Sequence, residues 1–125
     1  MPENGPLKRW SDLMVEAGEK SGFSLTTCGQ AADMMQNAGF VDIGRIPFKW
    51  PINQWPREPK WKEVGQCTEH NFHHGVETMM LALFTRFMGW TREEVVEFSN
   101  AVKQEFHDVR KHAYFDLYVT YGRKP

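Results

Sequence analysis

The spacing of apolar residues along this chain follows two periods, one typical of helices and one typical of strands. Apolar side chains that recur every three to four positions indicate amphipathic helices, and apolar side chains that alternate with polar ones indicate strands. The helical period predicts helices over residues 6–22, 27–38, 60–88 and 92–109. The alternating period predicts strands over residues 40–50 and 112–122. We expect these elements to pack as a single domain over residues 1–125.

The helix at 60–88 is the most apolar of the four. Its main stripe consists of Phe72, Val76, Met79, Met80, Leu83, Phe84 and Phe87. Because Leu81 and Met88 project from the opposite side, we expect the second half of this helix to be buried on two sides. In the helix at 27–38, the residues expected to face inward are Ala31, Met34, Met35 and Ala38.

Local signals predict particular features of these elements. Thr91 and Glu94 have the spacing of a capping box, which marks the start of the last helix. In the strand at 40–50, the apolar residues change parity, which predicts a bulge near Gly44. Pro47 cannot donate a hydrogen bond to a neighbouring strand, so we expect this strand at the edge of a sheet.

Composition and charge narrow the class of protein. The contents of 41% hydrophobic and 25% charged residues are ordinary for a soluble globular protein. The 14% aromatic content and seven methionines favour a pocket for a flat apolar ligand or a large subunit interface. A net charge of -1 gives no reason to expect nucleic-acid binding. Two cysteines make no disulfide framework and no apolar run could span a membrane, so we expect a cytoplasmic protein.

Three stretches of the chain carry a family resemblance. They are Ala38–Ile43, Leu81–Trp90 and His112–Pro125. Together with Pro51–Pro56, they resemble the C-terminal region of fungal secondary-metabolism methyltransferases, which depend on S-adenosylmethionine. The resemblance runs from about Leu7 to the end of the chain.

The resemblance implies an α+β fold in which helices pack on a small antiparallel sheet, as a truncated Rossmann-like methyltransferase fold. In this family the sheet ends in an antiparallel pair of strands, which here correspond to 40–50 and 112–122, and the helices between them roof the substrate site. The cofactor-binding half of the family is not recognisable. No G-x-G-x-G loop follows a strand, and no acidic residue is placed to hold a ribose. We therefore expect no cofactor and no methyl transfer by this chain alone.

The strand at 112–122 raises a problem of unpaired backbone groups. In the intact fold of the family this strand is bonded on both sides, whereas here one neighbour is missing. An exposed strand edge invites pairing with another chain. We expect a second copy to pair through 112–122, which would extend the sheet to four strands in a homodimer. A methyltransferase-like partner chain would cover the same edge.

Histidines gather on the helix at 60–88. His70 and His74 are four residues apart, as are His73 and Glu77, so all four lie near one face. Imidazole titrates near neutral pH, and a histidine next to a carboxylate can act in acid–base catalysis. We take these four residues as the candidate catalytic group; a solvated polar face is the alternative. No metal site is predicted, because a single helix supplies no fourth ligand.

The candidate substrate-binding residues are Arg86, Trp55, Trp61, Met80, Phe84 and His112. Arg86 lies on an apolar flank of its helix, where it would anchor an anionic ligand or pair with Glu69 or Glu77. Trp55 lies within the proline-rich stretch at 50–59 and Trp61 just after it, where they would line the mouth of a pocket or pack in the core.

The sequence therefore favours a small-molecule biosynthetic enzyme that works without a cofactor. Such an enzyme would bind an apolar substrate between the helices and use the histidines and Glu77 to move protons in a cyclisation, isomerisation or dehydration. The alternative is a non-catalytic partner or regulatory subunit of a methyltransferase, or a truncated methyltransferase fragment.

Overall fold

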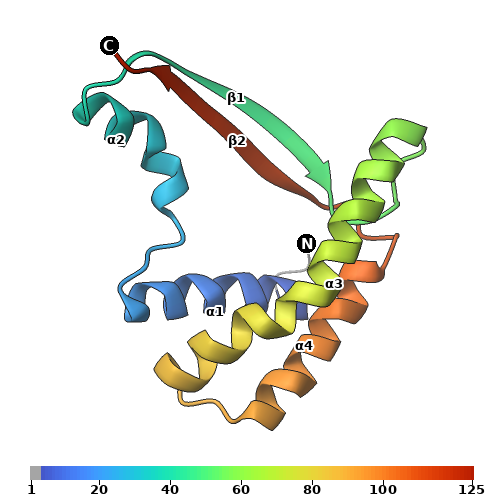
Figure 1. Cartoon of the computed structure of the whole chain (residues 1–125). Coiled ribbons are helices and arrows are strands. Elements are labelled where there is room, and N and C mark those ends of the chain that lie inside the picture. The colour runs from blue at the N-terminus through green and yellow to red at the C-terminus, as the bar shows by residue number, and fades with distance from the viewer. Residues whose placement is uncertain (1–3) are drawn as a thin grey trace.

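The computed structural model of the chain describes residues 4–125 and has the expected α+β composition (Figure 1). Its elements are α1 (Pro6–Ser21), a 3-10 turn η1 (Thr27–Gln30), α2 (Ala31–Asn37), β1 (Val41–Pro51), α3 (Pro59–Phe87), α4 (Arg92–His107) and β2 (Tyr114–Arg123). The ends differ from the expected ranges by at most two residues, although the helix expected at 27–38 is divided into η1 and α2. The expected class, helices packed with a small antiparallel sheet, is confirmed.

Helices α1, α3 and α4 pack around the main apolar core. The buried apolar residues are Leu7, Met14, Ala17, Ile52, Val76, Met80, Phe84, Val95, Val102 and Phe106. Where the middle of α3 meets the C-terminal end of α4, the rings of Phe72 and Phe106 stack with their centroids 3.8 Å apart. The predicted capping box is present at the start of α4, where Thr91 and Glu94 each accept a hydrogen bond from the other's backbone N–H.

Strands β1 and β2 form a long antiparallel ribbon whose two faces differ in polarity. The cross-strand pairs on one face are Ile46 and Val119, Phe48 and Leu117, and Trp50 and Phe115. We call these six residues the apolar sheet face. The opposite face carries Arg45, Lys49, Tyr114, Asp116, Tyr118 and Thr120. The predicted bulge is present, because the register shifts between Val41 and Gly44.

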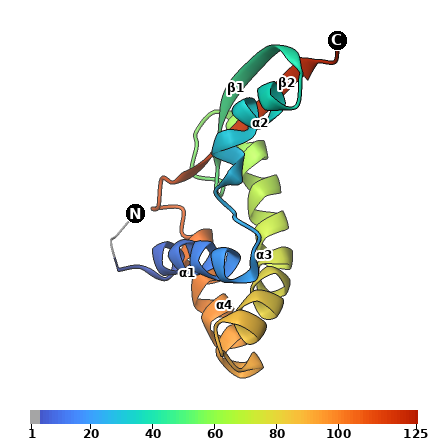
Figure 2. The ribbon, with the colours of Figure 1, turned by 90° about the vertical axis from the view of Figure 1, so that its left-hand side faces the viewer.

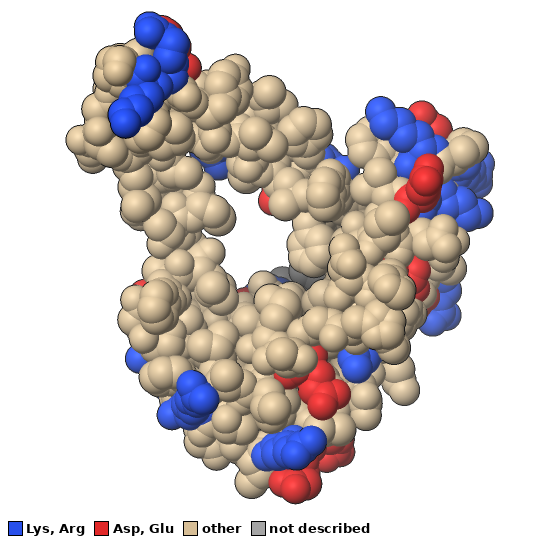
Figure 3. All heavy atoms as spheres, viewed as in Figure 1, with Lys and Arg blue, Asp and Glu red and all other residues tan. Residues whose placement is uncertain are grey.

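The ribbon and the helices enclose an opening. Figures 1 and 2 show the ribbon projecting away from α3 and α4, with α2 attached near its far end. In the space-filling view of Figure 3, a hole separates the ribbon from the helices beneath it. Much of the apolar sheet face is therefore exposed: Ile46 is 43%, Trp50 44% and Val119 49% exposed.

Two expectations about burial were wrong. None of the seven residues of α2 is buried, and Met34, expected to face inward, is 53% exposed. The second half of α3 is covered on one side only, since Met79 is 53% and Phe87 41% exposed. The apolar pattern predicted contacts on these surfaces, but no element within residues 4–125 packs against them closely enough to bury them.

Candidate functional site

Helices α3 and α4 bring four histidines together on one surface. The three histidines predicted on α3 lie side by side, with the rings of His70 and His74 4.5 Å apart and those of His73 and His74 5.2 Å apart. Across the helix contact, His73 Nδ1 lies 2.9 Å from Nε2 of His107, and His107 Nδ1 contacts the Glu69 carboxylate. These residues line a shallow hollow with Gln54 and Gln66.

The contacts determine how protons are arranged in this cluster. A carboxylate only accepts hydrogen bonds, so His107 donates from Nδ1 to Glu69. In its neutral form His107 then accepts at Nε2, and His73 donates from Nδ1. Nε2 of His73 keeps a free lone pair in this arrangement. Glu69, His107 and His73 thus form a hydrogen-bonded chain that ends in a potential base, which is the chemistry of an acid–base site.

The electrostatic surroundings favour the neutral form of His73. Burial lowers the pKa of its imidazole, and the positive charge of Lys103 and the neighbouring histidines act in the same direction. Glu77, predicted to pair with His73, instead lies 4.0 Å from the Lys103 ammonium. Among residues 4–125, no group of three or more His, Cys, Asp or Glu side chains is arranged to hold a metal ion.

The lowered pKa of His73 predicts a loss of stability in mild acid. The imidazole of an unfolded chain takes up a proton near pH 6.5, before folded His73 does, so the unfolded state is favoured progressively as the pH falls below that value. We expect the free energy of unfolding in urea to fall between pH 7.5 and 5.5, and to fall less in His73→Gln. His112→Gln, at a histidine that is not among the groups shifting the pKa of His73, is the control. Equal pH dependence in His73→Gln and the unchanged protein would contradict the assignment.

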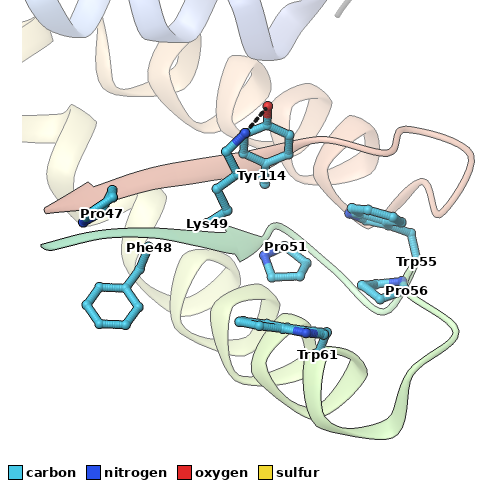
Figure 4. Close-up of a pocket in the computed structure, with 8 residues that line it drawn as sticks. All are labelled: Pro47, Phe48, Lys49, Pro51, Trp55, Pro56, Trp61 and Tyr114. Atoms are coloured by element: carbon cyan, nitrogen blue, oxygen red, sulfur yellow. Dashed lines mark hydrogen bonds between the residues drawn. The ribbon is translucent and has the colours of Figure 1, made fainter.

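A second candidate site is an apolar cavity of about 470 Å³ where β1 ends (Figure 4). Its lining residues, which we call the tryptophan pocket, are Pro47, Phe48, Lys49, Pro51, Trp55, Pro56, Trp61 and Tyr114. Trp55 donates from Nε1 to the backbone oxygen of Ala113 at 2.8 Å and stacks on His112, with the ring centroids 4.8 Å apart. Lys49 donates to the Tyr114 hydroxyl at 3.1 Å, which raises the pKa of Lys49.

The structure divides the predicted substrate-binding residues among three places. Trp55 and Trp61 line the tryptophan pocket, and His112 stacks on Trp55 without being one of the lining residues. Met80 and Phe84 have no exposed surface and belong to the core, so a ligand reaches them only if the core opens. Arg86 lies with Leu83 and Phe87 along a separate hollow of about 390 Å³, and it forms no ion pair within the described residues.

Buried Asn53, which the sequence analysis did not single out, holds the loop of the tryptophan pocket in place. Its Nδ2 donates to the backbone oxygens of Phe106, at 2.7 Å, and Asp108, at 3.2 Å, and its Oδ1 accepts from the backbone N–H of Trp55 at 3.0 Å. Gly65 of α3 lies directly against the Asn53 carbonyl. One residue therefore joins the loop to both α3 and α4.

The length and hydropathy of the helices and the similarity of the chain to known proteins both bear on its class. No helix within residues 4–125 is sufficiently long and apolar to cross a membrane. Comparison with known proteins finds relatives that align with the whole length of the chain.

The chain is 32% identical over 125 residues to a protein named probable methyltransferase tdiE from Emericella nidulans, an alignment that covers 100% of the chain and 39% of tdiE. It is 35% identical over 125 residues to methyltransferase pytC from Aspergillus terreus, again covering 100% of the chain and 39% of the relative. Secondary metabolism regulator LAE1 from Cochliobolus heterostrophus is 25% identical over 126 residues, which cover 100% of the chain and 41% of LAE1. No family model and no solved structure matches the chain.

These comparisons confirm the resemblance to fungal secondary-metabolism methyltransferases and fit a C-terminal fragment of such enzymes. The chain spans about two-fifths of the length of these relatives, as the coverage of 39% to 41% shows. The similarity therefore describes this part of the relatives, and it gives the cofactor-free cyclase no support.

Proposed function

We propose that this chain is the helical lid and outer-strand part of a fungal secondary-metabolism methyltransferase, and that it acts with a cofactor-binding part located on another polypeptide or another segment. The observation that carries this proposal is the similarity over 100% of the chain to 39% of each of two methyltransferases. In this role the chain would cover an apolar small-molecule substrate, while the other part would hold S-adenosylmethionine.

The exposed apolar sheet face supports the proposal that another part of the protein or another chain packs against this one. Ile46, Trp50 and Val119 each leave more than 40% of their surface exposed on one side of a ribbon. A contiguous apolar surface of this kind is typical of an interface. The edge of β1 contains Pro47 and Pro51, which lack an N–H, so the free edge of β2 is the better one for pairing with a further strand.

Two other interpretations remain predictions. A cofactor-free cyclase or isomerase would use the chain of Glu69, His107 and His73 as its acid–base group, but the relatives are methyltransferases and regulators. A homodimer paired through β2 would occupy the same free edge of β2 as a strand of a methyltransferase partner. Light scattering at increasing protein concentration distinguishes a dimer from a monomer that awaits a different partner.

The proposed function is tested by S-adenosylmethionine binding in three proteins. They are this chain alone, tdiE without the 39% that the chain matches, and a chimera in which the chain replaces that 39%. We expect calorimetry to detect cofactor binding only in the chimera, because the cofactor site needs the cofactor-binding part and that part needs its sheet completed. Micromolar binding by this chain alone, or no binding by the chimera when tdiE itself binds, would contradict the proposal.

A pair of substitutions in the chimera tests the role of the sheet face. Val119→Lys places a charge on the apolar sheet face, and Thr120→Lys places the same charge on the opposite, polar face. We expect Val119→Lys to reduce cofactor binding and thermal stability, because the lysine would be buried against the cofactor-binding part. Thr120→Lys should leave both nearly unchanged. Equal effects of the two variants would argue against a partner on the apolar sheet face.

A further inference from the structure

We propose that the tryptophan pocket binds a flat aromatic molecule that carries a carboxylate or phenolate oxygen. The inference goes beyond the proposed function, because the pocket is formed entirely by residues of this chain and requires neither S-adenosylmethionine nor a cofactor-binding part.

The walls of the tryptophan pocket suit a planar apolar ligand. Figure 4 shows the Trp61 ring lying flat beneath Pro51, with Phe48 on the same side of β1 and Trp55 with Pro56 at the far end. Aromatic rings favour offset stacking with other rings, and a cavity of about 470 Å³ is within the range of small-molecule sites. The site therefore accommodates a bicyclic or tricyclic ring system.

Charge at the rim favours an anionic ligand. The Lys49 ammonium lies 4.5 Å from the centre of the Tyr114 ring, and Lys60 lies 5.1 Å from the centre of the Trp61 ring. Asp116 faces Lys49 across the ribbon, but no ion pair joins them in the described part of the chain. Among residues 4–125, no acidic side chain lines the pocket. An anionic oxygen beside a stacked ring would thus meet Lys49 and the Tyr114 hydroxyl, and the carboxylate that it competes with is that of Asp116.

The pocket is also held in shape without a ligand. The Trp55 side chain is fixed by Ala113 and His112, and its backbone N–H is bound by Asn53. Trp61 lies in the first turn of α3, which begins at Pro59. Side chains that are already ordered lose little conformational entropy on binding, which favours affinity for a small ligand.

The proposal is tested by NMR titration of the full chain with two probes of almost equal size. The probes are 2-naphthoate, which is anionic, and naphthalene-2-carboxamide, which is neutral. We expect the indole N–H signals of Trp55 and Trp61 to shift with both probes, while that of Trp10, in the helical core, does not. The dissociation constant of the naphthoate should be lower by about fivefold at low salt, as for one partly exposed charge pair.

Three variants separate stacking from charge. Lys49→Gln should remove the preference for naphthoate and leave carboxamide binding intact, and Trp61→Ala should weaken both probes by about tenfold or more. Lys62→Gln, on α3 but outside the pocket, is the matched control and should change nothing. Circular dichroism verifies that each variant is folded. If Trp61→Ala does not fold, Lys49→Gln alone still tests the proposal.

Several results would overturn the proposal. They are equal affinity for the two probes, shifts that spare Trp55 and Trp61, and an unchanged naphthoate preference in Lys49→Gln. Tighter binding of a proline-rich peptide than of naphthoate would also overturn the proposal, because it would identify the pocket as a peptide-binding site. The titration uses the chain without S-adenosylmethionine. Success or failure of the pocket proposal therefore leaves the outcome of the cofactor-binding test unaffected.

Discussion

Gly65→Ala is expected to destabilise the chain by about 3 kcal/mol or more, because the added methyl group would overlap the Asn53 backbone carbonyl. The obstacle is backbone that is itself held by the Asn53 side chain, so it cannot rotate away as a flexible side chain would. To make room, α3 must move away from the loop that carries Trp55. The free energy of unfolding in urea, followed by the helical circular dichroism signal, measures the loss.

Gly75→Ala is the matched control, because both glycines lie within α3. A methyl group on Gly75 meets no atom within 4 Å. Alanine is favoured over glycine in a helix by about 1 kcal/mol, so this variant should be more stable than the unchanged chain. Two glycine-to-alanine substitutions in one helix are thus expected to shift stability in opposite directions. A stabilising Gly65→Ala would contradict the close contact between α3 and the loop.

Asn53→Ala is expected to lower the free energy of unfolding by about 2–3 kcal/mol, because the buried backbone oxygen of Phe106 and the partly buried one of Asp108 both lose their donor. The backbone N–H of Trp55 loses its acceptor in the same variant. Urea unfolding measures the stability. Under conditions where Asn53→Ala is folded, naphthoate titration should show weaker binding, since the Trp55 backbone N–H is no longer bound by Asn53.

Asn71→Ala provides the comparison for this prediction. Asn71 is an exposed residue of α3, and a surface substitution of this kind is expected to change stability by about 0.5 kcal/mol or less. A loss in Asn53→Ala that is no larger than in Asn71→Ala would show that the Asn53 hydrogen bonds contribute little. Asn53→Asp extends the test, because a carboxylate facing two carbonyl oxygens should be at least as destabilising as alanine.

The sequence located part of the histidine site. Placing His70, His73 and His74 on one face of a helix required only the helical period. Their partner His107 comes from α4, more than 30 residues later in the chain, and the pattern within one helix contains no information about it. Glu69 is four residues before His73, a spacing that places both near one face of the helix and could have brought Glu69 into the candidate group.

The substrate-binding candidates show the same limit. Trp55 lies within the proline-rich stretch at 50–59 and Trp61 just after it, and the structure places both in one pocket. Met80, Phe84 and Arg86 lie on the same helix, but periodicity cannot tell which apolar side meets a neighbour and which lines a cavity. For that reason two of these residues are in the core and the third is at a separate hollow.

The sequence by itself determined the type and approximate ends of the helices and strands, the capping box and the β-bulge. The capping box joins residues three positions apart, and the 3.6-residue and two-residue periods show which positions of one element share a face. A change of parity within one strand is likewise visible in the sequence alone. Only the tertiary structure decided that His107 meets His73, that Asn53 connects the pocket loop to α3 and α4, and that one face of the ribbon stays exposed. Those features depend on how distant segments pack, which local periodicity does not encode.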